Sequence, residues 1–304
     1  MLASLESGQG RVSIFGFTGI PGIAPASAQQ VLAWRPRSRP RGAPPRTFRR
    51  RSNRLLATNG IWQTRPMPEQ LPIRILVLNP KGGCGKTTIA TNLACWYAHS
   101  GRQVSLMDYD QQGSSTHWLA TRHAREPAIH AIPAFRQEPS GVTRAFQFRL
   151  PFDTSRVIID TPAGAPNSEV RRLLRLADVV IVPVLPSPID IHAAAAFIRR
   201  VEKEREHRPI ALVANRVRDN TRGLAKLQEF LGQLMVPVIG TLRDLQIYVQ
   251  CAEAGQGIYD VDARAHLRER QALSGIAAWI DNAADDAEPR APSRVHTDLR
   301  AEPL

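Results

Sequence analysis

The feature that most constrains the fold is a glycine-rich stretch at residues 80–88, which reads PKGGCGKTT. It follows a short apolar run at residues 73–79, typical of a buried parallel strand, and precedes a helically spaced apolar pattern at residues 89–98. Strand, glycine loop and helix in this order bind phosphate, because glycines let backbone N–H groups turn inward and the helix N-terminus adds partial positive charge. The stretch therefore predicts a nucleotide site in which Lys86 contacts phosphates and the Thr87 hydroxyl binds Mg²⁺.

The loop differs by one residue from the general pattern G-x-x-x-x-G-K-[ST], because Pro80 stands at the position of the first glycine. A second lysine, Lys81, precedes Gly82. This variant resembles the deviant Walker A loop of the ParA/MinD family of P-loop ATPases. The resemblance implies that Lys81 and Lys86 act on the phosphates of ATP. It also implies that the whole loop binds the nucleotide: Lys81, Gly82, Gly83, Cys84, Gly85, Lys86, Thr87 and Thr88.

Two acids follow the second expected strand, residues 103–108, which ends at Asp108 and is followed closely by Asp110. The carboxyl end of a parallel strand faces the crevice where such sheets bind ligands, although an ordinary strand-to-helix turn has a similar composition. Beside a phosphate loop, acids are needed to organise Mg²⁺ and the attacking water. The segment is similar to the family's switch I, D-x-D-x-Q-x-S. That similarity implies that Asp110 polarises water and that Asp108 supports the metal shell.

Two further strand ends carry candidate residues. Asp160 ends the β-branched run at residues 156–160, an arrangement in which the carboxylate holds Mg²⁺; the alternative is an acid that caps the next turn. The continuation DTPAG is similar to the family's switch II. The run VANR at residues 213–216 resembles the family's adenine contact, which implies that Asn215 pairs with adenine; asparagine also favours turns for local reasons.

Alternating strands and helices from Ile73 onward predict one α/β P-loop domain, whose mostly parallel twisted sheet is covered by helices on both faces. The domain is expected to span residues 67–284, with a disordered, proline-containing tail at 285–304. The further strands are expected at 128–132, 156–160, 179–185, 210–215 and 236–240. The further helices are expected at 114–125, near Gly141, and at 189–206, 224–234, 245–254 and 263–284.

The net charge of +13 is concentrated at the N-terminus. Residues 1–66 contain eleven arginines, no lysine and one acid, Glu6, and their prolines and like charges oppose a packed core. Three interpretations remain for this expected disordered leader. The protein starts at Met67 and the upstream start is mis-assigned, or the segment is a basic arm that binds DNA phosphates, or it is an arginine-rich targeting peptide.

The cysteines and the apolar runs indicate the cellular compartment in which the protein is expected. Cys84, Cys95 and Cys251 form no C-x-x-C pair, which argues against a disulfide framework or a cysteine-rich zinc site and favours a reducing cytoplasm. No apolar run approaches the ~18–20 residues of a transmembrane helix. We therefore expect a cytoplasmic, nucleoid-associated protein without a membrane partner.

The resemblance implies a switch ATPase of the ParA branch. Two subunits would enclose two ATP molecules, with Lys81 reaching the partner's phosphates, and the ATP-bound homodimer would bind DNA without sequence preference. A ParB-like or cargo-adaptor protein would stimulate slow hydrolysis and so reset a dimer that positions a plasmid, a chromosome or a protein cargo. The expected DNA contacts are four arginines, each of which could equally be a solvated surface residue: Arg216, Arg218, Arg222 and Arg243.

Two alternatives come from the same superfamily. A MinD-like protein would bind membrane through a C-terminal amphipathic helix, but residues 289–299 contain prolines and have no apolar face. A metabolic enzyme would need cluster-ligating cysteine pairs or a substrate pocket, and the sequence indicates neither.

Overall fold

The computed structural model describes residues 55–58, 61–64, 71–136, 148–204, 208–232, 234 and 236–287. The predicted leader, residues 1–66, lies outside the described residues except for two short antiparallel strands, β1 (Leu55–Thr58) and β2 (Ile61–Thr64). No regular element was predicted there. The intervening pair, Asn59-Gly60, is a combination that two-residue hairpin turns favour, so a local signal for the hairpin was present.

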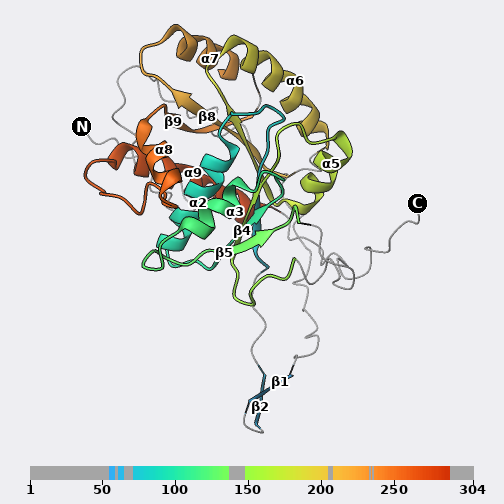
Figure 1. Cartoon of the computed structure of the whole chain (residues 1–304). Coiled ribbons are helices and arrows are strands. Elements are labelled where there is room, and N and C mark those ends of the chain that lie inside the picture. Colours follow the sequence, from blue (N-terminus) through green and yellow to red (C-terminus); the bar gives the residue numbers. More distant parts are fainter. Residues whose placement is uncertain are drawn as a thin grey trace, which may run out of the picture. The chain divides into compact units, whose positions relative to one another are not determined.

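Seven strands form the central sheet in the order β5-β4-β6-β3-β7-β8-β9, and all neighbouring pairs are parallel. This confirms the predicted α/β fold with a parallel sheet. Figure 1 shows β4 beside β5 and β8 beside β9. The strands are β3 (Ile73–Val77), β4 (Val104–Asp108), β5 (His130–Pro133), β6 (Arg156–Asp160), β7 (Val179–Val184), β8 (Ile210–Val217) and β9 (Val238–Arg243). Strands β4, β6 and β7 are buried along their whole length, because helices cover both faces of the sheet.

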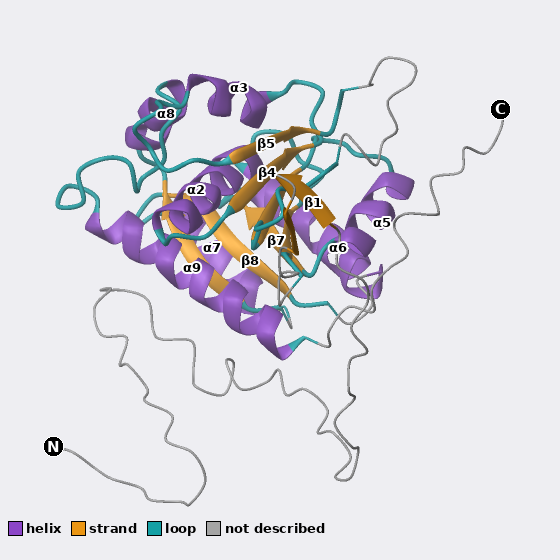
Figure 2. Cartoon of the chain, turned by 90° about the horizontal axis from the view of Figure 1, so that it is seen from below, coloured by secondary structure: helices purple, strands orange, loops and turns teal. Residues whose placement is uncertain are grey.

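The helices divide between the two faces, and Figure 2 shows α5 and α6 on one side of the strands and α2 and α9 on the other. Side chains of α5, α6 and α7 pack against one face, and those of α2, α3, α8 and α9 against the other. The helices are α2 (Lys86–His99), α3 (Ser114–Thr121), α5 (Asn167–Leu176), α6 (Pro188–Glu204), α7 (Arg222–Gly232), α8 (Gln246–Glu253) and α9 (Leu267–Asp286).

Some expected elements differ from the structure. Helix α5 was not predicted, although Val170, Leu173 and Leu174 recur at helical spacing and are buried. Helix α9 continues to Asp286, into the range expected to be a disordered tail, and the rest of that range from residue 288 lies outside the described residues. The helix expected near Gly141 also lies outside them. No helix among the described residues is long and apolar enough to cross a membrane.

The strand order determines which loops meet. Strand β6 lies between β3 and β4, and in the register of the sheet Asp160 is opposite both Val77 and Asp108. Because the carboxyl ends of parallel strands share one edge, the glycine loop after β3 and the acids of β4 and β6 come together there.

Candidate functional site

The glycine loop reaches its helix through two left-handed residues, Gly83 (φ 74°) and Gly85 (φ 91°). Gly85 is the N-cap residue of α2, so the first N–H groups of that helix open toward the loop. A Cβ at position 85 would stand 2.0 Å from Nδ2 of Asn215. Both the backbone conformation and this close approach therefore require glycine at position 85.

The two loop lysines have different surroundings. Lys86 is buried, and its ammonium donates to the carbonyl of Lys81 at 3.1 Å. The Lys81 side chain is 41% exposed and forms an ion pair with Asp190 at the start of α6, at 2.9 Å. The Cys84 thiol also donates to the Lys81 carbonyl, at 3.2 Å, and burial raises its pKa. Cys84 therefore packs as a neutral small residue, and Lys81 keeps its ammonium at the surface of the loop.

Asp160 is the most unusual acid among the described residues. It is fully buried, and neither carboxylate oxygen has a hydrogen-bond partner. Its pKa is raised to about 7, mainly by burial and also by the nearby Asp108 carboxylate, although the neighbouring Thr87 and Ser115 hydroxyls and the Lys86 ammonium act to lower it. The hydroxyl of Ser115 is likewise buried without a partner. Unpaired carboxylate and hydroxyl oxygens beside a phosphate loop are the hard ligands that Mg²⁺ prefers, so these residues fit that ion.

Asp108 and Asp110 organise the turn into α3. The Asp108 carboxylate is buried and accepts from the N–H of Asp110 (3.0 Å) and from the N–H and hydroxyl of Thr116 (2.9 and 2.8 Å). Asp110 is half-buried and accepts from the N–H of Gln112 at 3.0 Å. The Asp108 carboxylate therefore stabilises the turn, and the Asp110 side chain lies nearer to solvent. Their predicted roles toward metal and water remain predictions.

Asn215 lies beneath the loop. Its side chain is buried, and Nδ2 donates to the carbonyl of Cys84 at 2.8 Å. In this structure the amide therefore contacts the phosphate loop. The adenine contact expected for it stays a prediction.

Comparison with known proteins identifies the family of this chain. Residues 75–258, more than half of it, match a family model described as the CobQ/CobB/MinD/ParA nucleotide binding domain. The chain belongs to this family. The resemblance inferred from the loop is thereby confirmed.

Individual relatives agree with this family. The chain is 30% identical over 194 residues to the maintenance of carboxysome distribution protein A of Halothiobacillus neapolitanus, covering 62% of this chain and 88% of that protein. It is 36% identical over 138 residues to the chromosome-partitioning ATPase Soj of Thermus thermophilus, covering 40% of this chain and 51% of Soj, about half its length. A plasmid partition protein of Borrelia burgdorferi bound to AMPPNP has the same fold, with a TM-score of 0.55 at 19% identity; the match covers 69% of this chain and 99% of that one.

A cavity of about 420 Å³ lies on the β8 side of this nucleotide-binding domain. Two of the four arginines predicted to contact DNA line it, and Arg218 forms an ion pair there with Asp244 at 2.7 Å. Its full lining is Leu185, Pro186, Ser187, Arg216, Arg218, Thr221, Gly223 and Asp244.

The other two arginines lie elsewhere. Arg222 is exposed at the start of α7, and Arg243 donates to the buried Glu269 at 2.8 Å. The structure thus does not gather the four arginines into one unpaired group. Asp190 and Ser115 were not predicted from the sequence, because their importance depends on contacts with residues distant in the chain or on burial.

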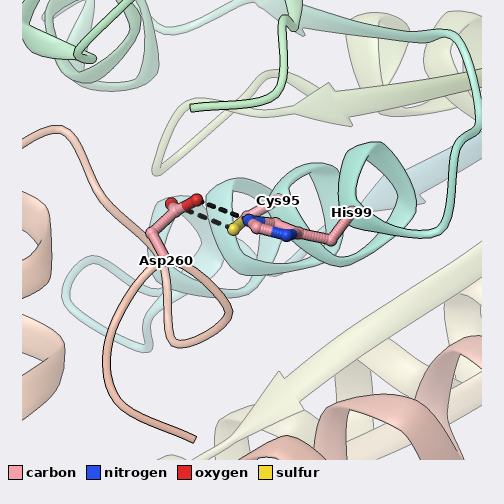
Figure 3. A group of neighbouring side chains, drawn as sticks. All are labelled: Cys95, His99 and Asp260. Atoms are coloured by element: carbon pink, nitrogen blue, oxygen red, sulfur yellow. Dashed lines mark hydrogen bonds and ion pairs between the residues drawn. The ribbon is translucent and has the colours of Figure 1, made fainter. Parts of the chain in front are cut away.

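A second group of polar side chains lies at the opposite end of α2, where Cys95 and His99 of the helix meet Asp260 of the loop after α8 (Figure 3). Their ligand atoms lie within 4.8 Å of one another, as a metal site would require. However, the Asp260 carboxylate already accepts from Arg122 (2.7 and 3.0 Å), His99 (2.7 Å), Cys95 (3.1 Å) and the N–H of Gly257 (2.8 Å). With this carboxylate paired to a guanidinium, the group joins α2 and the end of α3 to the loop after α8.

Proposed function

We propose that this protein is an ATP-driven positioning ATPase of the ParA type. The observation that carries the proposal is the buried, unpartnered carboxylate of Asp160 beside Thr87, under a loop that also presents Lys81. A buried unpaired carboxylate is costly to the folded protein and is expected where a cation completes its coordination. Relatives named for carboxysome distribution and chromosome partitioning support the positioning role.

In the proposed cycle, the residues of the chain act as follows. Lys86 exchanges the Lys81 carbonyl for the phosphates of ATP. Thr87 and Asp160 would hold Mg²⁺, which would supply positive charge beside those phosphates. Asp110 orients the attacking water. Lys81 leaves Asp190 and reaches the phosphates bound by a second subunit, where its ammonium stabilises the charge that develops during hydrolysis. The ATP-bound unit is therefore a homodimer, and slow hydrolysis returns it to monomers.

The proposed track for positioning is nucleoid DNA, bound through its phosphates by arginines of the dimer. Arg216 and Arg222 are the better candidates, because both are exposed and the guanidinium groups of Arg218 and Arg243 are engaged by acids. A cargo-associated adaptor protein would stimulate hydrolysis, as expected for a switch whose own rate is low.

A MinD-like role at a membrane surface is the second candidate. The septum site-determining protein MinD of Synechocystis is 24% identical over 235 residues, covering 67% of this chain and 85% of that protein. The two candidates differ in what the ATP-bound dimer binds: DNA for the ParA type and anionic lipid for the MinD type.

DNA binding with ATP, with ADP and in the Lys86→Ala variant, measured across a salt series, tests the proposal. We expect binding only with ATP, loss of binding in the variant, and a steep decrease with salt because phosphate contacts release counterions. Arg222→Ala should weaken binding and lower the salt slope, whereas the matched variant Arg102→Ala, at an exposed turn after α2, should not. ATP-dependent binding to anionic vesicles without DNA binding would favour the MinD-like role, and ATP-independent DNA binding would contradict both.

A further inference from the structure

Strand β8 is irregular at the residue that reaches the phosphate loop. Its pairing with β9 shifts register between Ala214 and Val217, and Arg216, inside that shift, has a left-handed backbone with φ 51°. A non-glycine residue in this conformation is strained and persists only when its surroundings impose it. Bulges of this kind commonly re-aim a side chain next to a functional site.

The side chain re-aimed here is Asn215. It is 4% exposed, and its amide nitrogen donates to the carbonyl of Cys84, 131 residues earlier in the chain, at 2.8 Å. The same amide packs against the backbone of Gly85, at a spot where no Cβ would fit. Asn215 thus contacts the loop at Cys84, between the two positive-φ glycines, Gly83 and Gly85.

This contact joins the phosphate loop to the irregular end of β8, a segment far away in the sequence. The next residue along the strand, Arg216, lines the 420 Å³ cavity. A side chain that only read the base would keep its amide free for the base. The amide of Asn215 instead donates to the carbonyl immediately before Gly85, the N-cap residue of α2.

We propose that Asn215 is a positioning residue for the phosphate loop, so that its loss weakens binding of the triphosphate whatever base is attached. The inference rests on the proposed nucleotide-binding function. With the Cys84 carbonyl held by Asn215, the N–H groups around Gly83 and Gly85 keep the inward orientation that phosphate requires. Without the donor, the loop keeps its glycines but loses the contact that fixes their orientation.

Competition binding tests the inference, with displacement of a fluorescent ATP analogue by ATP, by ITP and by inorganic tripolyphosphate, each with Mg²⁺. ITP carries a carbonyl where ATP carries the adenine amino group, and tripolyphosphate has no base. In Asn215→Ala and in the uncharged, similarly sized Asn215→Leu, both of which remove the donor, we expect all three affinities to fall by the same factor, on the order of tenfold. The ratio of ATP to ITP affinity should not change.

The exposed Asn282 on α9 provides matched controls, Asn282→Ala and Asn282→Leu, which should change none of these affinities. Thermal unfolding of each variant shows whether a loss of affinity comes from a rearranged loop or from an unfolded chain, and Asn215→Leu keeps the test available if Asn215→Ala does not fold. A selective loss of ATP affinity, with ITP and tripolyphosphate unchanged, would show that Asn215 reads the base and would overturn the inference. A wild-type protein that binds neither ATP nor tripolyphosphate would refute the proposed function itself.

Discussion

A buried aspartate carboxylate lies beside each end of helix α2, Asp160 at the end of β6 and Asp260 in the loop after α8, and the two have opposite surroundings. At the N-terminal end, Asp160 has no hydrogen-bond partner, and its pKa is raised. At the C-terminal end, Asp260 accepts from Arg122, Gly257, His99 and Cys95. Burial alone would raise the pKa of Asp260, but these donors hold it well below its usual range.

This difference distinguishes a carboxylate that can bind a ligand from one that only stabilises the fold. Asp260 receives every donor that it needs from the chain, so it joins three segments and leaves no coordination position for a ligand. The Asp160 carboxylate has no donor or positive charge bound to it, and a cation would supply that charge. A buried acid that is costly in the unliganded protein is therefore the better guide to function than the cluster whose residue types look more like a metal site.

The largest expected effect comes from replacing the unpartnered acid. Asp160→Asn should lower Mg²⁺-dependent ATP hydrolysis by at least about 100-fold, because the metal loses its carboxylate. The same variant should leave the unliganded protein as stable as the wild type or more stable, because the neutral amide is cheaper to bury. Steady-state hydrolysis and thermal unfolding of the nucleotide-free protein check the two halves. A strongly destabilised Asp160→Asn protein would contradict the proposed difference between Asp160 and Asp260.

Asp260→Asn should show the opposite pattern. Its loss leaves the buried guanidinium of Arg122 without a counter-charge, so the free energy of unfolding should fall by about 3–5 kcal/mol. Hydrolysis per folded molecule should be close to that of the wild type. Urea unfolding and activity normalised to the folded fraction measure this. Intact stability combined with lost hydrolysis would move Asp260 into the functional site.

The dependence of stability on pH should also distinguish the two acids. The folded-state pKa of Asp160, about 7, exceeds the reference value of 3.8, so stability should decrease as pH rises between these values and then level off. Mg²⁺ binding should strengthen over the same window, since the ion binds the ionised form. For Asp260 the pKa is depressed, so its stabilisation is present above 3.8 and is lost as pH falls below that value.

Thermal unfolding across pH of the wild type, Asp160→Asn and Asp260→Asn measures these slopes. Asp160→Asn should lack the decrease between 3.8 and 7, and Asp260→Asn should lack the acid-side loss. A wild-type profile that is unchanged by Asp160→Asn would mean that this carboxyl ionises normally.

The smallest expected effect is at the rim of the Asp260 group. His99→Ala and Cys95→Ala each remove one donor from a carboxylate that Arg122 still pairs, so each should cost about 1 kcal/mol of stability. Neither should change nucleotide binding. Urea unfolding of the two variants tests this, and a cost as large as that of Asp260→Asn would mean that Arg122 is not the main partner.

The sequence predicted what depends on local pattern. The glycine loop, the acids at strand ends and the alternation of strands and helices all follow from short-range spacing, and the parallel sheet follows from that alternation. Helix α5 was missed although its apolar residues have helical spacing, because most of its other residues are polar and a loop was expected after Asp160.

What could not be predicted depends on contacts between distant segments. The Lys81–Asp190 ion pair, the bond from Asn215 to Cys84 and the absence of any partner for Asp160 all depend on which strands become neighbours. The family resemblance implied that Asn215 contacts adenine, and that contact stays a prediction. Its hydrogen bond to the Cys84 carbonyl could not be foreseen, because the bond depends on β8 lying close to the loop.

The most direct test of the whole account is the molecular mass of the protein in solution with Mg²⁺ and either ATP or ADP. Asp110→Ala, expected to bind ATP without hydrolysing it, should double its mass with ATP and remain a monomer with ADP. Adding Lys81→Ala should abolish the dimer while ATP binding persists, because that lysine acts on the partner's phosphates. A dimer that forms equally well without Lys81, or a chain that stays monomeric with ATP bound, would contradict the proposed switch.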